Sequence, residues 1–397
     1  RSLVGSEMCI RDRSTRVEYL GANKDFTPMS MNMSTHAMNY GSWADWDWLK
    51  ANVPVMCNWD GGIDYFLDPD DYTKKADGTN SDAANIDYAG DAMAIVKKIY
   101  KKEYKVGNDR YVYFCERKVD DDFHAVGFNV LGKERDYMLI PMFYGSIDSN
   151  GKMRSIAGQW SCLTASGSAA DNATGKAIGT AEQYTAIQAA SSKALFFGGA
   201  LTNTLADICI LLSKSTDSQT AFGSGMCSTY VEDKTQHYGT KINTVIGGGQ
   251  FYGSNDNKSF NKIFHSCVMG SYMLWQRDPY MLLINGRIKV SPDYTYDLTG
   301  AKYLDTGVNL AKNGYYATTQ VVKDFGAVPN DEIACSSATG YCDHTWVNAE
   351  IPAVSLRFGG CSDGADDGLW ARALNYVAAH AGWGGGASKL LPAPAAA

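Results

Sequence analysis

The C-terminal stretch of the chain, residues 356–391, constrains the fold more than any other segment. Two tryptophans, Trp370 and Trp383, stand in a frame of glycines and alanines. The frame reads Gly-Gly, then Asp-Gly-Leu-Trp, then Leu-Asn, then Trp-x-x-Gly-Ala-Ser, and the residues between these positions share no chemistry. An ordinary glycine-rich terminal strand and loop is one interpretation. The spacing of the frame favours a fixed scaffold that carries variable positions.

This frame resembles the C-terminal variable region of C-type-lectin-fold proteins that diversity-generating retroelements target. In that family an error-prone reverse transcriptase mutates template adenines, so selected asparagine codons come to encode other residues. Changing only the adenines of AAC or AAT gives Ala, Cys, Asp, Gly, His, Arg, Ser, Val or Tyr, and never Trp, Met, Lys, Glu or Gln. The resemblance implies a binding protein with an evolvable surface rather than an enzyme.

The resemblance places a variable region over residues 359–389. Adenine changes cannot produce Trp370 and Trp383, which suits a fixed scaffold, and Leu374 and Asn375 of the frame belong with them. The candidate ligand-binding positions all hold residues that adenine changes can reach, and they are Cys361, Ser362, Asp363, Asp366, Ala371, Arg372, Ala373, Tyr376, His380, Gly382, Gly384 and Gly385.

Large side chains in this region are expected to carry the binding energy, because Tyr, Trp and Arg give a large contact area with few rotors or bidentate hydrogen bonds. Asp363 and Asp366 would accept hydrogen bonds from hydroxyls or pair with amines. The side chains expected to contribute most are Tyr376, Arg372, Trp370 and His380.

A wider set of motifs looks like the body of tail-associated lectin-fold proteins in phages of gut bacteria, over residues 40–391. Relatives are expected to carry an aromatic stretch ending in Trp-Gly before Trp275, whereas this chain has Met-Gly-Ser-Tyr-Met-Leu-Trp. The resemblance implies an α+β, C-type lectin-like (formylglycine-generating-enzyme-like) fold, with two helices packed on small antiparallel sheets with long loops. The motifs are residues 144–145, 153–158, 216–225, 251–254 and 275–277.

The N-terminal residues need separate treatment. Residues 3–12, Leu-Val-Gly-Ser-Glu-Met-Cys-Ile-Arg-Asp, resemble a translated sequencing adaptor, and such segments are excluded from fold reasoning. We therefore expect residues 1–13 to be an artefact that hides the natural N-terminus and any signal peptide. Residues 14–39 are expected to be a linker or truncated remnant, residues 40–391 the lectin-like domain with insertions, and residues 392–397 a disordered tail.

The composition of the chain indicates which classes of partner it is expected to bind. The 397 residues are 45% hydrophobic, enough for a large core, and the net charge of −7 gives no support to nucleic-acid binding. No apolar run is long enough to span a membrane. Ten cysteines include Cys9 of the adaptor segment, and the other nine are scattered, which favours buried thiols over a disulfide framework.

Local patterns predict the main elements. Residues 111–116 and 136–144 have the content of strands, and residues 181–194 and 201–214 have helical spacing. Thr180 and Gln183 fit a capping box for the first helix. Trp46 and Trp48, at a spacing of two, favour an edge strand with one buried face, although with Trp43 they could form a sugar-stacking platform.

Two charged segments have ordinary interpretations. Residues 91–105 begin apolar and then carry five lysines, which favours a solvated strand, hairpin or helix face over a polyanion patch. Asp120, Asp121 and Asp122 precede His124, but too few oxygen ligands follow at loop spacing for calcium, so an acidic turn is favoured.

An enzyme of the formylglycine-generating type, which shares the lectin fold, is the alternative from another class. Cys335, Cys342 and His344 lie near one another in sequence, with Cys361 as a fourth ligand, yet they lack the spacing of a structural zinc site. No nucleophile elbow, P-loop or His-Glu-x-x-His motif is present. We therefore expect neither catalysis nor a cofactor or metal.

The sequence thus predicts a phage tail-fibre tip or tropism determinant in the virion tail, which binds a host-surface protein or glycan and contacts other tail proteins. No nucleic acid or membrane insertion is expected, and the family suggests a homotrimer. The alternative is a bacterial cell-surface adhesin with the same fold and variable patch.

Overall fold

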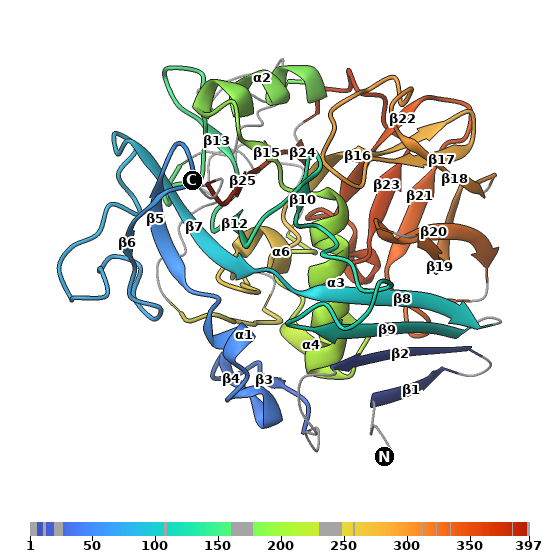
Figure 1. Ribbon diagram of the computed structural model, residues 1–397, viewed down its shortest axis with the longest axis horizontal. Helices are drawn as coiled ribbons and strands as arrows, with labels where there is room; N and C mark the ends of the chain where they lie inside the picture. The colour runs from blue at the N-terminus through green and yellow to red at the C-terminus, as the bar shows by residue number, and fades with distance from the viewer. Residues whose placement is uncertain are drawn as a thin grey trace.

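The computed structural model describes residues 6–10, 13–19, 27–106, 109–159, 178–229, 248–256, 259–311, 313–322, 324–333, 335–382 and 384–394. Strands outweigh helices in these residues, and the helices lie among several sheets (Figure 1). The structure is therefore mixed in class, with β-sheet dominant.

The largest sheet has nine strands and includes two short segments of the predicted variable region, residues 372–374 and 385–386. Its β21–β23 and β16–β24 pairs are parallel and the other pairs are antiparallel. It is therefore larger than the small antiparallel sheets expected, and mixed. In spatial order its strands are β18 (Leu304–Asn309), β17 (Arg287–Val290), β16 (Trp275–Ile284), β22 (Ala353–Arg357), β23 (Arg372–Leu374), β21 (His344–Val347), β19 (Gly314–Val322) and β20 (Gly326–Ile333), with β24 (Gly385–Gly386) beside β16.

A six-stranded sheet holds the C-terminal end of the chain. Pro392 of its strand β25 lies opposite Met138, and Ala393 is only 5% exposed. Pro392 and Ala393 are therefore part of the packed fold, although a disordered tail was expected from residue 392. The strands are β15 (Leu195–Phe196), β25 (Lys389–Pro392), β12 (Tyr137–Pro141), β7 (Gly90–Lys97), β5 (Pro54–Asn58) and β6 (Ile63–Phe66).

The N-terminal strands join a third sheet of four strands. Residues 6–10, within the adaptor-like segment, pair with β2, and β2 pairs in parallel with β9. The strands are β1 (Ser6–Ile10), β2 (Arg13–Tyr19), β9 (Asp109–Cys115) and β8 (Tyr100–Val106). Three two-stranded pairs complete the β structure of the described residues: β3 (Ser30–Asn32) with β4 (Ala37–Asn39), β10 (Asn129–Val130) with β11 (Lys133–Glu134), and β13 (Ser146–Ile147) with β14 (Met153–Arg154).

Helix α3 (Gly199–Ser213) runs through the centre of the molecule (Figure 1). Every residue from its start to Leu212 is buried, and it packs against β16 and β20. The leucine and isoleucine spacing predicted this helix over residues 201–214, and the prediction is confirmed. It ends where Lys214 adopts a left-handed backbone with φ of 54°.

Helix α2 (Thr180–Ala190) is also confirmed, but its ends differ from the prediction. The backbone N–H of Gly179 donates to Glu182 Oε2 at 2.9 Å, so the cap lies one residue before the predicted Thr180. The helix stops before residue 194 because Ser191 is extended. The other helices in the part of the chain that the structure describes are short: η1 (Gly41–Trp43), α1 (Asp47–Lys50), α4 (Ser218–Phe222), α6 (Cys267–Gly270) and η2 (Gly364–Asp366).

The tryptophan cluster near residue 46 is core, but it is not a strand. Trp43, Trp46 and Trp48 are each at most 3% exposed, which confirms the structural interpretation over a sugar platform. They lie around η1 and the start of α1, so the predicted edge strand is wrong. The Trp46 and Trp48 rings stack with centroids 4.9 Å apart. A single turn of the chain therefore buries both rings.

The lysine-rich segment forms strands β7 and β8, and a strand was one of the structures predicted for it. One of its lysines, however, is buried rather than solvated. Lys101 is 1% exposed, and its ammonium lies 2.6 Å from Glu103 and 2.7 Å from Asp207 of α3. The two other segments predicted to be strands, residues 111–116 and 136–144, overlap strands β9 and β12.

Among the described helices, none has the length and apolar character to cross a membrane.

Candidate binding surface

The predicted variable positions divide between core and surface. Residues 361–385 leave β22, pass through η2 and β23, turn, and return as β24 beside β16. Ser362 is exposed, and Asp363, Asp366, Tyr376, His380, Gly382 and Gly384 are partly exposed. The buried positions are Cys361, Ala371, Arg372, Ala373 and Gly385.

Two side chains expected to carry contact energy face inward instead. Arg372 is 1% exposed, and its Nη2 donates to Asn203 of α3 at 2.8 Å. Trp370 is 4% exposed, and its ring lies against Tyr341 with centroids 4.7 Å apart. Neither residue is available to a ligand in this conformation, because α3 and Tyr341 cover them.

Trp370, which the frame suggested as a scaffold residue, is packed within the fold. Its backbone N–H donates to the buried carboxyl of Asp343 at 2.7 Å, and the Arg110 guanidinium lies 5.4 Å from its ring centroid. Leu374 is fully buried in the core, whereas Asn375 is partly exposed. Trp383, the other predicted anchor, lies outside the described residues.

Four partly exposed rings form a continuous row beside the loops that hold candidate variable positions. Tyr316 meets His344 edge to face with centroids 5.1 Å apart, and His344 meets Trp346 at 4.3 Å. Trp346 then meets Trp275 edge to face at 5.3 Å. We call Tyr316, His344, Trp346 and Trp275 the aromatic row. It connects the neighbouring strands β19 and β21 with β16, which β22 and β23 separate from β21 in the sheet order.

Predicted variable carboxylates lie at both ends of the aromatic row. The Tyr316 hydroxyl donates to Asp366, and the Trp275 indole N–H donates to Asp363 Oδ2 at 3.0 Å. Gly384 lies beside the row as well, because its carbonyl accepts the backbone N–H of Trp275 at 2.9 Å. The sequence did not single out the row, because its members come from strands far apart in the chain.

The electrostatics leave the row with neutral rings. Burial lowers the pKa of His344, although Asp366 partly offsets the effect, so the imidazole is uncharged at neutral pH. Burial raises the pKa of Asp363 above its ordinary value, and the Trp275 hydrogen bond opposes that shift. The surface therefore combines aromatic faces with hydrogen-bond acceptors, an arrangement suited to recognising hydroxyls and apolar groups together.

Tyr376 and His380 form a second part of the surface. Their rings lie 4.5 Å apart, and burial together with Arg277 lowers the pKa of His380. The turn that carries them is fixed by its backbone, because the His380 carbonyl accepts from Arg277 and the Tyr376 carbonyl accepts from Val354 N–H. Both rings are thus presented from a rigid turn.

The cysteines near this region have the properties of buried structural thiols. Burial raises the pKa of Cys342 and of Cys361 to about 12, whereas reactive cysteines have a lowered pKa. Among the described residues, no group of three or more His, Cys, Asp or Glu side chains has a metal-binding arrangement. The thiol-enzyme alternative gains no support from this geometry.

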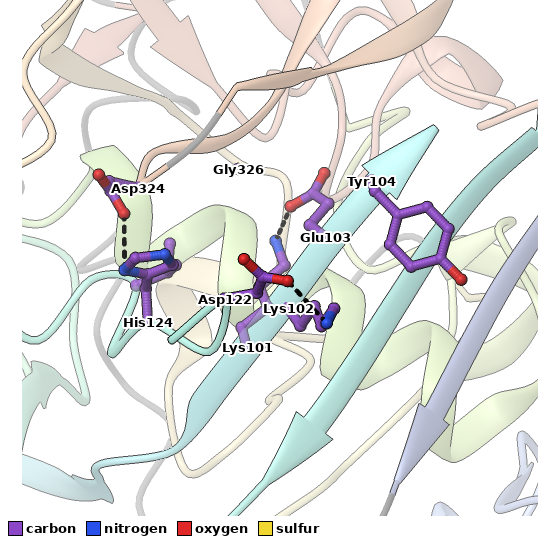
Figure 2. Close-up of a pocket in the computed structure, with 9 residues that line it drawn as sticks. Lys101, Lys102, Glu103, Tyr104, Asp122, His124, Asp324 and Gly326 are labelled. Atoms are coloured by element: carbon purple, nitrogen blue, oxygen red, sulfur yellow. Dashed lines mark ion pairs between the residues drawn. The ribbon is translucent and has the colours of Figure 1, made fainter. Parts of the chain in front are cut away.

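A cavity of about 270 Å³ lies between β8 and the loop that leads to β20. Figure 2 shows that its charged side chains pair with one another across the cavity. The Lys102 ammonium lies 2.8 Å from the carboxylate of Asp122, which belongs to the predicted acidic turn. His124 Nδ1 lies 3.0 Å from the carboxylate of Asp324. These pairs, with the ion pair of Lys101 and Glu103, leave little unsatisfied charge for a ligand.

No protein-family model matches the sequence, and a search of curated proteins finds no match.

Proposed function

We propose that this chain is a receptor-binding protein, a phage tail-fibre tip or tropism determinant, with a C-type lectin-like fold. The supporting observation is that the partly exposed candidate variable positions Asp363, Asp366 and Gly384 border the aromatic row. In this proposal the row is a constant platform, and the variable loops at its edges set which host-surface protein or glycan binds.

The physical basis of recognition is a rigid aromatic platform. Tyr and Trp rings lose little conformational entropy on binding, and a ring already held by its neighbours loses less. Trp346 touches two other rings of the row, so its orientation is fixed before a ligand arrives. Display of several copies would convert weak single-site contacts into avidity.

The burial of each candidate position limits which side chains diversification can place there. Ser362, Asp366 and Tyr376 can change without disturbing the core, because they are exposed or partly exposed. Ala371 and Ala373 are at most 2% exposed, so larger residues there would overpack the sheet. A functional population should therefore carry broad substitutions at the first set and small residues at the second.

The test is deep sequencing of codons 359–389 across a population that carries this gene. We expect substitutions limited to adenine-bearing codons at the candidate positions, with the Trp370 and Trp383 codons unchanged. Even scatter of substitutions along the segment, or none at all, would remove the support for a diversified surface. Binding of host cells by the purified chain then tests whether that surface recognises a receptor.

A further inference from the structure

A buried lysine joins the C-terminal strand β25 to a strand that is not its neighbour. Lys389 is the first residue of β25, and its Nζ is in direct contact with Oδ2 of Asp91 on β7. Both side chains are 0% exposed. Strand β12 lies between β25 and β7 in the sheet, so this pair spans a strand and joins residues 298 positions apart.

The surroundings of the pair keep it away from solvent. The Lys389 ammonium lies 4.9 Å from the Trp59 ring centroid, and the Arg154 guanidinium lies 4.7 Å from the same centroid. Cys57 lies opposite Asp91 in the β5–β7 register, and burial raises the pKa of its thiol well above the ordinary value. Because both members of a buried ion pair lose their hydration, such a site favours a neutral product over the two charges.

The two carboxylate oxygens of Asp91 have different partners. Oδ1 accepts the backbone N–H of Ser155 at 2.7 Å and the Nε–H of Arg154 at 3.2 Å, whereas Oδ2 contacts Lys389. Donors on one oxygen stabilise the negative charge that develops there when a nucleophile adds to the carboxyl carbon. The other oxygen is then placed to take protons from the attacking nitrogen and to leave.

Another buried lysine–carboxylate pair in the fold lacks this arrangement. The Lys101 ammonium lies between two carboxylates, 2.6 Å from Glu103 and 2.7 Å from Asp207. Both oxygens of Asp207 accept hydrogen bonds from Arg110 at 2.7 Å, so neither is placed to leave. Lys101 and Asp207 are therefore expected to remain an ion pair, and they provide an internal control.

We propose that Lys389 and Asp91 condense to form an intramolecular isopeptide bond. A proton passes from Nζ to Oδ2, and the nitrogen lone pair attacks Cγ of Asp91 to form the C–N bond. A second proton passes to Oδ2, the Cγ–Oδ2 bond breaks, and water leaves. The ammonium and the carboxylate thus give one amide and one water, with no net change of charge and no co-reactant. Reacting groups that a fold holds in contact reach effective molarities of about 10⁵–10⁸ M, which accelerates this step.

The bond would fasten a strand that its own ladders hold only briefly. Strand β25 pairs with β12 through two residue pairs and with β15 through two more. A covalent link from Lys389 to β7 would keep the end of the chain in the sheet. It does not depend on the proposed receptor-binding surface, because neither linked residue is a candidate ligand-binding position.

Mass spectrometry of the intact chain and of its tryptic digest tests the proposal. We expect the intact mass to lie below the sequence mass by one water. Trypsin should release residues 76–97 joined to residues 373–397, because it does not cleave after an acylated lysine. The peptides that carry Lys101 and Asp207 should be released separately from each other, and a link between them would overturn the part assigned to the donors on Asp91 Oδ1.

Lys389→Arg is the matched variant, since it keeps the positive charge but lacks the nucleophilic amine. Its intact mass should equal its sequence mass, and it should migrate more slowly than the parent in a denaturing gel, because no internal loop is closed. Should this variant fail to fold, the digest of the parent decides alone. A succinimide at an Asp–Gly step, such as residues 60–61, also removes one water but leaves the two peptides separate. The proposal is overturned if the parent has its full sequence mass, or if trypsin releases the two peptides separately.

Discussion

Arg357 and Arg372 share one hydrogen-bond acceptor, the Oδ1 of Asn203, at 2.9 and 2.8 Å. Arg357 also pairs with the buried carboxylate of Asp278. Arg372 has no ion pair among the described residues, and its Nη1 has no hydrogen-bond partner there. Burial, and then Arg357, lower the pKa of Arg372 well below its ordinary value. Arg372 is thus a buried cation without a counter-charge of its own.

Replacing Arg372 should therefore stabilise the protein. Arg372→Met keeps much of the side-chain volume and removes the buried charge, so we expect the free energy of unfolding to rise by roughly 1–4 kcal/mol. Urea unfolding at neutral pH measures this difference. Host-cell binding should not change, because the side chain faces α3. A loss of binding without a change in stability would return Arg372 to the contact surface.

The neighbouring ionic cluster should respond in the opposite way. Asp207 accepts two hydrogen bonds from Arg110 at 2.7 Å and lies 2.7 Å from the Lys101 ammonium. Burial alone would raise the pKa of Asp207, but Arg110 and Lys101 outweigh it and hold the pKa below the ordinary value. The carboxylate therefore stabilises the fold above about pH 4, and this contribution is lost as the pH falls through the lowered pKa.

Asp207→Asn should lower the free energy of unfolding by about 3–5 kcal/mol, because two buried cations lose their shared counter-charge. The matched control is Asp136→Asn, whose side chain is 84% exposed and pairs with Lys98. That change should stay within about 0.5 kcal/mol of the parent. Equal effects in chemical denaturation would contradict a structural role for the cluster.

The sequence predicted elements whose signals are local. The apolar spacing along α3 lies within one helix, and that helix is confirmed. Trp46 and Trp48 were placed on a strand because a spacing of two is typical of strands, yet a helical turn with stacked rings buries the same pair. Periodicity over so few residues does not distinguish these structures.

Long-range partners explain the other differences. Lys101 sits in a lysine-rich segment, and nothing near it in sequence indicates that Asp207 of α3 lies against it. The aromatic row likewise joins Trp275 to Trp346, which only the sheet order brings together. Arg372 is buried because its strand faces α3. The frame of glycines and tryptophans indicated only the position of Arg372 in the sequence, and not its packing against α3.

A buried lysine should make the free energy of unfolding depend on pH between neutral and alkaline values. Lys262 is 1% exposed, and its Nζ lies 3.4 Å from the Tyr72 hydroxyl, which also contacts His265 at 2.7 Å. Burial lowers the pKa of Lys262 to about 7, although Cys267 and Asp70 oppose the shift. Between about pH 7 and pH 10.4 the unfolded chain binds more protons at this residue than the folded chain does.

The free energy of unfolding should therefore rise with pH in that window, by at most about 1.4 kcal/mol per pH unit from this residue. Lys262→Met removes the titrating group, so the variant should be more stable than the parent near pH 7 and lose that advantage towards pH 10. Urea unfolding of both proteins over this range measures the difference. Parallel pH profiles would show that Lys262 keeps an ordinary pKa in the fold.

The proposed binding surface makes the last prediction. Tyr376 is partly exposed and contacts His380 on a turn that its backbone holds in place. Tyr376→Ala should therefore lower affinity for host cells while leaving the melting temperature nearly unchanged. A hot-spot side chain contributes about 2 kcal/mol or more, which corresponds to a roughly 30-fold loss of affinity.

The matched control is Tyr104→Ala, since Tyr104 is 36% exposed on β8 and stacks on Tyr111 with centroids 5.1 Å apart. Its loss should leave host-cell binding unchanged, because β8 lies in a different sheet from the aromatic row. A fall in melting temperature for Tyr376→Ala with full binding retained would assign that ring to stability. Equal losses of binding in both variants would instead point to general adhesion through exposed tyrosines, and the proposed surface would have no special role.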